Sequence, residues 1–436
     1  MLSVLRHPNR EQRRLAPIGR QGAVNSFSQI FRALIIFGFL ALIILAGAAR
    51  SPARAQDKPA SNAAFATYIQ SLWPLAQARG VTRPVFDAAF EGVSAPSQSI
   101  LKHTKKQAEF VKPIWDYLAG AISQQRIERG RARAAEFSTV LSQIEQRYGV
   151  DPYVVMAIWG METSYGSFTG GENVIRALAT LAFAKYRGDF FRDELLNALQ
   201  ILQQGHVSPA AMVGSWAGAM GQTQFMPSSF FKYAVDFDGD GRKNIWTNLP
   251  EALASTANYL AQYGWVKGET WGYEVILPAG YDVSPHDPLK FRSFAQWRAD
   301  GLTRGDGEAM PSGGEAALLL PSGVRGPAFL MTQNFRVIKS YNQSTFYALG
   351  VALLSDRIAG LGGLKGAWPK GDKLLSVNET KELQKHLTRL GFDVGEADGR
   401  VGDKVQTALR AWQRKIGVMA DGYPTTAMLE RMRKAR

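Results

Sequence analysis

The sequence of 436 residues contains no cysteine. Disulfide bonds, cysteine-ligated zinc sites and thiol nucleophiles are therefore excluded, and so is the lipid-carrying cysteine of a bacterial lipoprotein. Charged residues make up only 20% of the chain, whereas hydrophobic residues make up 46%. This balance excludes an intrinsically disordered protein and predicts a globular one. The length allows two or three domains.

The positive charge is unevenly distributed along the chain. Residues 1–55 contain eight arginines and one glutamate, so they carry half of the net charge of +14. The modestly basic remainder suits an anionic polymer, such as a nucleic acid or a cell wall with carboxylated peptides. Charge alone does not choose between these partners.

An apolar run of 17 residues, Ala33–Ala49, follows the first arginines, and a small-residue ending follows at Pro52–Ala55. This layout predicts a secretory signal peptide over residues 1–55, with cleavage near Ala55. The alternative is an uncleaved membrane anchor, because the run nearly spans a bilayer. Both interpretations place the body of the chain outside the cytoplasm, in the periplasm or anchored at the inner membrane. Export argues against nucleic acid as a partner.

Helical signals dominate the body of the chain. Asp151-Pro152, Ser208-Pro209 and Asn248-Leu249-Pro250 each predict a helix start, because a polar cap stands close before a proline. Residues 264–330 differ, since they are rich in Gly, Pro and Trp and contain strand-like fragments. We expect a small β-containing insert there on a mainly helical domain.

The end of the chain has its own organisation. The glycine-rich stretch 359–371 predicts a linker. Residues 372–436 contain a weak duplication, in which a helix leads to an Asp-Gly turn at Asp398-Gly399 and again at Asp421-Gly422. The sequence therefore predicts a separate small domain after the linker.

Glu162 is a candidate catalytic residue. If a helix begins at Pro152, residues three and four apart share a face. The residues on the face of Glu162 are then Val155, Ile158 and Trp159. A carboxyl on such an apolar face is partly desolvated, which raises its pKa toward that of a general acid. Gly160 and Gly166 are expected to let a substrate approach the backbone. On spacing alone, a glutamate turned to solvent at the helix end explains the segment as well.

Two further segments have the composition of a sugar-binding cleft. Val213–Ser229 combines small residues, amides, aromatic rings and methionine. This composition suits the stacking of sugar rings on apolar side chains, with a few polar groups positioned for hydrogen bonds. The alternative is a helical turn that packs through its glycines. Asn334–Tyr347 interleaves amides with tyrosines and suits N-acetyl and hydroxyl groups. Its alternative is simple helix capping by Asn342 or Ser344.

Three motifs, in this order, resemble the lytic murein transglycosylase B family. They are Trp159-Gly-x-Glu162-Thr, the block Gly218-Ala-Met-Gly-x-x-Gln-Phe-Met-Pro-Ser-Ser229, and Tyr341-Asn-x-Ser-Thr345. The resemblance covers residues 60–360 and implies a mainly α, lysozyme-like catalytic domain with Glu162 as its only acid/base. It also implies that five residues line the substrate cleft: Ser215, Gln224, Phe225, Tyr341 and Asn342.

The tail, residues 372–436, resembles a small three-helix peptidoglycan-binding domain. The matching positions are Leu383-Gln384, Leu390-Gly391-Phe392, Asp398-Gly399, Thr407-Ala408, Trp412-Gln413 and Asp421-Gly422. A generic helical cap is the alternative. The neighbouring wall-directed domain favours binding to peptidoglycan glycan strands.

The family resemblance implies cleavage between N-acetylmuramic acid and N-acetylglucosamine, with 1,6-anhydro ends and no required cofactor. A hydrolytic muramidase is an alternative, but it needs a second carboxylate. The nearest acidic neighbours of Glu162 in sequence are Asp151 and Glu172, and neither lies in a motif. A non-catalytic wall-binding scaffold is a further alternative.

The segment 236–247 resembles a calcium-binding loop. Asp236, Asp238 and Asp240 stand at its first, third and fifth positions, and a glycine needed for the turn stands at the sixth. The twelfth position should carry a bidentate carboxylate, yet it is Thr247. The pattern therefore predicts either a weak calcium site or an aspartate-rich turn without an ion.

Overall fold

The computed structural model describes residues 62–105 and 112–434. The predicted signal peptide, residues 1–55, lies outside the described residues. Among the helices of the described ranges, none is long and apolar enough to cross a membrane. The described residues all lie within one compact unit of the chain.

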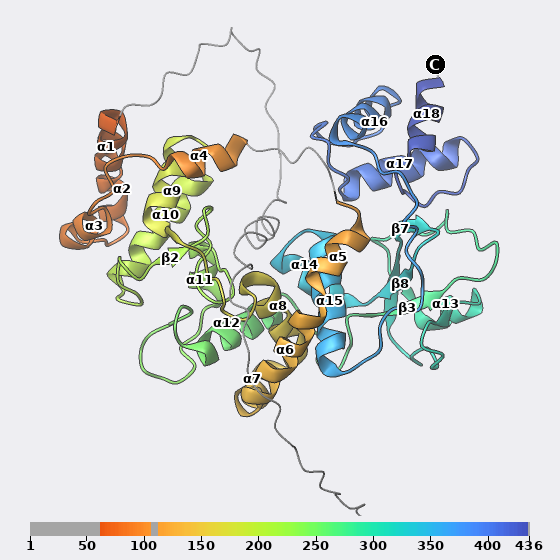
Figure 1. Ribbon diagram of the computed structural model, residues 1–436, viewed down its shortest axis with the longest axis horizontal. Helices are drawn as coiled ribbons and strands as arrows, with labels where there is room; N and C mark the ends of the chain where they lie inside the picture. The colour runs from red at the N-terminus through yellow and green to blue at the C-terminus, as the bar shows by residue number, and fades with distance from the viewer. Residues whose placement is uncertain (1–61, 106–111, 435–436) are drawn as a thin grey trace, which may run out of the picture. The chain divides into compact units, whose positions relative to one another are not determined.

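The first four helices pack against a pair of helices from the middle of the sequence (Figure 1). Aromatic rings fill the space between them: Phe65 meets Phe183 edge to face, with ring centroids 5.2 Å apart. Phe86 is fully buried and lies against Trp73. The helices of this group are α1 (Asn62–Ser71), α2 (Trp73–Ala78), α3 (Arg83–Ala89), α4 (Gln98–Lys105), α9 (Val174–Phe183) and α10 (Phe190–Gln203).

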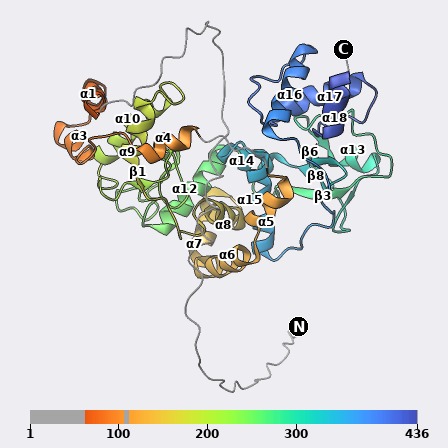
Figure 2. The same cartoon turned by 45° about the horizontal axis from the view of Figure 1, so that its top comes forward.

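Helix α8 (Pro152–Thr163) is the centre of the next group. Seven consecutive residues, Val154–Gly160, are buried. The sequence predicts one apolar face, but the structure covers the helix on all sides, because α6, α7, α12 and α15 all contact it (Figures 1 and 2). The other helices of this group are α5 (Ile114–Ala121), α6 (Gln124–Glu136), α7 (Ser138–Tyr148), α11 (Pro227–Tyr233), α12 (Leu249–Gln262), α14 (Gln333–Tyr341) and α15 (Thr345–Ala359).

Two of the three proline-marked helix starts are present. Asp151 caps α8 by accepting the Tyr153 N–H at 2.7 Å, and Asn248 caps α12. The prediction of a helix after Ser208-Pro209 is wrong. Residues 208–212 form a single turn, because the chain then extends into strand β2 (Val213–Gly214), which pairs with β1 (Glu172–Asn173).

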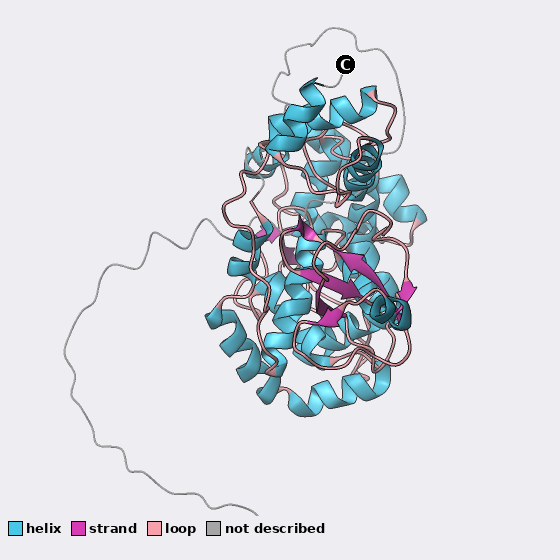
Figure 3. Cartoon of the chain, turned by 90° about the vertical axis from the view of Figure 1, so that its right-hand side faces the viewer, coloured by secondary structure: helices cyan, strands magenta, loops and turns pink. Residues whose placement is uncertain are grey.

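The expected β-containing insert is an antiparallel sheet of five strands in the order β4-β6-β8-β3-β5 (Figure 3). It has its own apolar core, in which the fully buried Trp297 donates a hydrogen bond to the Ala316 carbonyl at 3.0 Å. The elements are β3 (Gly272–Ile276), β4 (Arg292–Ser293), α13 (Phe294–Ala299), β5 (Thr303–Arg304), β6 (Glu315–Leu319), β7 (Pro321–Val324) and β8 (Ala328–Met331).

Three helices form the C-terminal region: α16 (Val377–Arg389), α17 (Asp403–Lys415) and α18 (Thr426–Lys434). The duplication seen in the sequence has matching geometry. Gln384 on α16 accepts the Gly399 N–H at 2.8 Å and donates to Asp398 at 3.0 Å. Gln413 on α17 makes the same pair of bonds, at the same two lengths, to the turn Asp421-Gly422. The mainly α fold with a β-containing insert and a three-helix C-terminal region is thus confirmed.

The predicted linker, residues 359–371, is fastened to the insert. The Glu274 carboxylate on β3 accepts the N–H groups of Lys365 and Gly366 at 2.8 and 2.6 Å. Beyond the linker, Asp421 accepts the Val324 N–H of β7 at 3.3 Å, and the buried Arg410 donates to the His286 carbonyl at 3.2 Å. The C-terminal helices therefore contact the insert directly.

Candidate active site

Glu162 lies in the last turn of α8, where the backbone leaves the helix through a left-handed turn. Ser164, Tyr165 and Gly166 have φ angles of 50°, 57° and 77°. Such angles are rare for residues with a side chain. The Tyr165 ring holds the turn, since it is buried against Trp159 and its hydroxyl donates to the Arg126 carbonyl at 3.1 Å.

The two glycines of this segment have structural roles. A Cβ on Gly160 would lie 2.6 Å from the Tyr165 hydroxyl, and a Cβ on Gly166 would lie 2.6 Å from Oε1 of Gln222. The expectation that both glycines admit a substrate to the backbone is wrong, because protein side chains already occupy those spaces. The glycines instead let the chain turn tightly directly after Glu162.

Among the described residues, one side chain donates a hydrogen bond to the Glu162 carboxyl. The Tyr347 hydroxyl, from α15, donates to Glu162 Oε1 at 2.6 Å. Burial raises the pKa of Glu162 to about 8, and the bond from Tyr347 offsets part of that rise. No carboxylate of the described residues is among the causes of this pKa shift. At neutral pH the group is therefore mostly protonated, as a general acid must be.

Tyrosines surround this carboxyl. The charge of Glu162 contributes to raising the pKa of Tyr117, Tyr341 and Tyr347, after burial as the largest cause. All three phenols therefore stay neutral, and they can donate hydrogen bonds without adding charge. Tyr341 uses its hydroxyl to donate to the Thr223 carbonyl at 2.7 Å.

The predicted cleft residues divide into two kinds. Ser215 and Gln224 hold their own segment together: the Ser215 hydroxyl accepts the Ala219 N–H at 3.0 Å, and the Gln224 amide donates to the Thr169 and Gly221 carbonyls. Gln224 also has a φ of 58° and is only 8% exposed.

Phe225 and Tyr341 lie together, with ring centroids 6.0 Å apart, and Phe225 is buried. Asn342 ends α14, and its side chain accepts the Ser344 N–H at 3.1 Å, while Ser344 caps α15. Of the two positions at which helix capping is the alternative, Ser344 is the N-cap of α15, whereas Asn342 makes a turn before it. Of the predicted cleft residues, Tyr341 is the one whose pKa is raised in part by the charge of Glu162, after burial as the largest cause. It therefore lies within electrostatic reach of the carboxyl.

Sequence reasoning missed Tyr347, Tyr117 and Gln222 as neighbours of the Glu162 segment. Tyr347 lies three residues after Ser344, which is the distance at which a helix cap orients the first turn. The segment Asn334–Tyr347 includes it, but no local signal relates it to a residue 185 positions earlier.

Four carboxylates gather at the loop 236–247, which we call the acidic loop. Asp236, Asp238, Asp240 and Glu251 offer oxygen atoms that all lie within 4.8 Å of one another, and we call these four residues the acidic cluster. Carboxylate oxygens suit Ca²⁺. Glu251, from the start of α12, is the fourth member that the sequence pattern did not reveal.

Thr247, at the expected twelfth position, is not part of the acidic cluster. Its hydroxyl instead accepts a hydrogen bond from the Asn244 amide at 2.7 Å. The buried Glu251 is held toward the loop because its carboxylate accepts the N–H groups of Phe237 and Asn244. The fourth carboxylate of the acidic cluster therefore comes from helix α12 and not from the loop itself.

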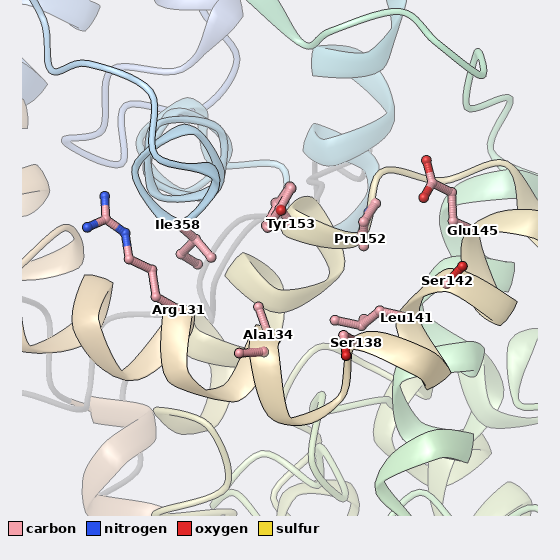
Figure 4. Close-up of a pocket in the computed structure, with 10 residues that line it drawn as sticks. Arg131, Ala134, Ser138, Leu141, Ser142, Glu145, Pro152, Tyr153 and Ile358 are labelled. Atoms are coloured by element: carbon pink, nitrogen blue, oxygen red, sulfur yellow. The ribbon is translucent and has the colours of Figure 1, made fainter. Parts of the chain in front are cut away.

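A shallow pocket of about 340 Å³ lies at the other end of α8 (Figure 4). It is lined by α6, α7, the start of α8 and Ile358, with Arg131 and Glu145 among its residues. Tyr153 in this pocket and Glu162 are nine residues apart on α8, which is about 13 Å along a helix. The pocket is therefore separate from the Glu162 site.

The helical fold and the buried carboxyl of Glu162 are typical of a lysozyme-like enzyme that acts on glycan strands. The model of the transglycosylase SLT domain matches residues 64–356, and that of a peptidoglycan binding domain matches residues 376–432. The chain belongs to the lytic murein transglycosylase B family, and it is a peptidoglycan lytic transglycosylase.

Individual relatives agree with this assignment. Membrane-bound lytic murein transglycosylase B of Escherichia coli is 35% identical over 273 residues, which are 61% of this chain and 69% of the relative. SltB3 of Pseudomonas aeruginosa, in complex with NAG-anhNAM-pentapeptide, is 47% identical with a TM-score of 0.81, over 85% of this chain and 99% of that one. Escherichia coli Slt35, in complex with calcium, is 30% identical with a TM-score of 0.56, over 68% of this chain and 92% of that one.

Proposed function

We propose that Glu162 is the sole acid/base of the transglycosylase reaction. The observation that carries this proposal is a desolvated carboxyl that, within the described residues, accepts a hydrogen bond from one tyrosine and has no carboxylate among the causes of its pKa shift. An ordinary glycosidase needs two carboxylates, one as acid and one as base or nucleophile. A single group with a pKa near the working pH can give a proton and take one back.

The proposed reaction has two proton transfers. Protonated Glu162 donates its proton to the glycosidic oxygen between N-acetylmuramic acid and N-acetylglucosamine, and that bond breaks. The oxygen of the substrate's 2-acetamido group bonds to the anomeric carbon as the glycosidic oxygen leaves, so the protein supplies no nucleophile. The ionised Glu162 then removes the proton of the muramic acid 6-hydroxyl, whose oxygen bonds to the anomeric carbon while the bond from the acetamido oxygen breaks. The product is a 1,6-anhydro end, and the NAG-anhNAM ligand of the SltB3 complex is consistent with it.

We assign the five predicted cleft residues two different tasks. Tyr341 and Asn342, at the junction of α14 and α15, contact the sugar. Ser215, Gln224 and Phe225 support the cleft wall, because Ser215 and Gln224 hydrogen-bond to neighbouring backbone groups and the Phe225 ring is buried against Tyr341. Tyr347 orients Glu162 and stabilises its ionised form between the two proton transfers.

We also propose that the acidic cluster binds Ca²⁺ and that the ion stabilises the acidic loop. Three aspartates and Glu251 supply the oxygen ligands, and Slt35 with bound calcium is a relative of this chain. The ion would offset the repulsion among four carboxylates at one loop. The reaction itself requires no cofactor.

We infer that residues 1–55 export the chain, that residues 60–360 are the catalytic domain and that residues 372–436 form the wall-binding domain after the linker 359–371. The enzyme then works in the periplasm on peptidoglycan glycan strands. If the signal is not cleaved, the protein is anchored to the inner membrane.

The product test is digestion of purified peptidoglycan followed by mass analysis of the soluble fragments. We expect muropeptides that end in 1,6-anhydro-N-acetylmuramic acid and are lighter than hydrolysis products by one water. Reducible muramic acid ends would instead indicate the hydrolytic muramidase. Absence of any cleared zone on a peptidoglycan zymogram would indicate the scaffold.

The wall-binding test compares the full chain with a chain that ends at Gly371. Both should digest isolated peptidoglycan, but the shortened chain should sediment less with intact sacculi, because a second binding domain raises the local concentration of the enzyme. Equal sedimentation of both chains contradicts wall binding by the C-terminal helices.

A further inference from the structure

Gln222 connects the end of α8 to the acidic loop. It occupies one of the two unspecified positions in the block Gly218–Ser229, so the family motif assigns it no role. Its side-chain oxygen accepts a hydrogen bond from the Trp159 indole at 3.0 Å, and its carbonyl accepts one from the Thr163 hydroxyl at 2.7 Å. These partners lie three residues before Glu162 and one residue after it.

The other two polar groups of Gln222 bind the acidic loop. Its backbone N–H donates to the Ile245 carbonyl at 2.9 Å, and its side-chain nitrogen donates to the Trp246 carbonyl at 2.9 Å. All four hydrogen-bonding groups of this residue are therefore engaged, two on each side. Gln222 is a bridge between the helix that carries Glu162 and a loop that packs beside it.

The chemistry of this position favours an amide. One end of the side chain must accept from an indole N–H and donate to a carbonyl, which a glutamine does without charge. The turn after Glu162 also packs on it, because Thr163 accepts the Gly166 N–H at 3.1 Å and Gly166 faces the Gln222 amide oxygen. A side chain at residue 166 would push that oxygen away from Trp159.

We propose that Gln222 is a positioning residue for Glu162, which holds the last turn of α8 in place against the acidic loop. The proposal rests on the acid/base role of Glu162 stated under Proposed function. A helix end is the least constrained part of a helix, because its last carbonyls lack intrahelical partners. Displacement of a catalytic group by about 1 Å can reduce turnover about 100-fold. A clamp on both sides of Glu162 in sequence prevents such displacement.

The test compares two variants of Gln222 with a matched control. Gln222→Met has nearly the same size and removes both side-chain hydrogen bonds, whereas Gln222→Glu keeps an acceptor for Trp159 but loses the donor to Trp246 when ionised. Gln200→Met is the control, because Gln200 is also half-buried and makes one hydrogen bond, to the Arg79 carbonyl, on α10. Each purified full chain is assayed on soluble glycan strands for kcat and KM across pH, and its melting temperature is measured.

We expect Gln222→Met to reduce kcat by about 10- to 100-fold while KM changes by less than about threefold. In this variant, the alkaline limb of the pH profile of kcat should move to lower pH. The reason is that a loosened helix end admits water to the carboxyl and lowers the pKa of Glu162. The groups that face Glu162 are Tyr117, Tyr341 and Tyr347, and these variants leave them in place. Gln222→Glu should show an intermediate loss, and Gln200→Met should behave as wild type.

The result that overturns the proposal is a pair of folded Gln222 variants whose kcat and alkaline limb match those of Gln200→Met. A parallel loss of stability and activity with an unchanged pH profile also overturns it, since that outcome describes a purely structural residue. If Gln222→Met does not fold, Gln222→Glu alone decides between these results. Glu162→Gln in the same assay separates the two hypotheses. Turnover above about a tenth of wild type in Glu162→Gln rejects the acid/base role, whereas a lower turnover there beside fully active Gln222 variants rejects only the clamp.

Discussion

Glu162 and the acidic cluster place the same chemical group in opposite surroundings. Glu162 is a single carboxyl among tyrosines and apolar side chains, and burial raises its pKa to about 8. In the acidic cluster, four carboxylates lie within 4.8 Å of one another, and Asp238 and Asp240 are exposed to water. The first arrangement favours a neutral acid that can transfer a proton, and the second favours a cation as a fifth partner.

The neighbours of a carboxyl therefore decide what that carboxyl can do. A buried carboxyl without a charged partner loses the solvation of its ionised form. Its pKa therefore rises toward neutral pH, where it can transfer a proton. Clustered carboxylates repel one another unless positive charge or N–H donors compensate them. Here the backbone N–H groups of Gly239 and Gly241 already bind Asp236, at 2.7 and 2.8 Å, which preforms the loop.

The largest expected effect is that of Glu162→Gln. Removal of a placed acid/base group typically reduces turnover about 10²- to 10⁴-fold, and the loss should be at least that large because one group serves both steps. The nearly isosteric change should leave the fold intact. The assay is release of soluble muropeptides from purified peptidoglycan, with the exposed Glu145→Gln as the matched control. Turnover above about a tenth of wild type would mean that another residue is the acid.

Tyr347→Phe tests the hydrogen bond that Glu162 accepts from Tyr347. The variant keeps the ring but loses the 2.6 Å hydrogen bond, so the ionised Glu162 formed during the reaction is less stable. A hydrogen bond to a charged group contributes about 1.5–3 kcal/mol, so we expect turnover to fall at least about tenfold. Because this bond lowers the pKa of Glu162, its loss raises that pKa and moves the alkaline limb of kcat to higher pH. An alkaline limb at the wild-type position would contradict this account.

The effect of calcium on the melting temperature tests whether the acidic cluster binds the ion. The sequence predicts a weak effect because of Thr247, whereas the cluster with Glu251 predicts a substantial one. Calcium at about 100 times its Kd should raise the melting temperature by roughly 3–5 °C. Glu251→Gln should lose most of this shift, while Thr247→Ala should keep it. Scanning calorimetry with calcium or with a chelator measures both variants, and an equal shift in wild type and Glu251→Gln would remove Glu251 from the ligand set.

The pH dependence of stability tests the burial of Glu162 without any substrate. Glu162 holds its proton more tightly when folded, with a pKa of about 8 against an ordinary value of 4.5. As pH rises from 4.5 to 8, the unfolded chain therefore releases this proton first, and the folded state loses stability over that window. Glu162→Gln lacks this loss, so its melting temperature relative to wild type should rise between pH 4.5 and 8 and level off above. A constant difference across that range would show that Glu162 is not desolvated.

Local signals in the sequence were enough for the parts of the molecule that depend on neighbouring residues. Asp151 before Pro152 identified the start of α8, and the spacing from that start placed Glu162 near its end. The composition of residues 264–330 indicated the β-containing insert, and the three family motifs indicated the class of enzyme. Ser208-Pro209 failed as a helix signal, because pairing between β1 and β2 extended the chain after one turn.

The tertiary structure decided what joins residues far apart in the chain. Tyr347 reaches Glu162 across 185 positions, and Gln222 reaches Trp159 across 63. Glu251 completes the acidic cluster from the next helix, at a position that a fixed loop spacing does not include. A sequence determines caps, turns and apolar patterns because these depend on residues a few positions apart. The desolvation of a carboxyl and the partners that it meets depend on which helices pack around it, and only the folded chain brings those helices together.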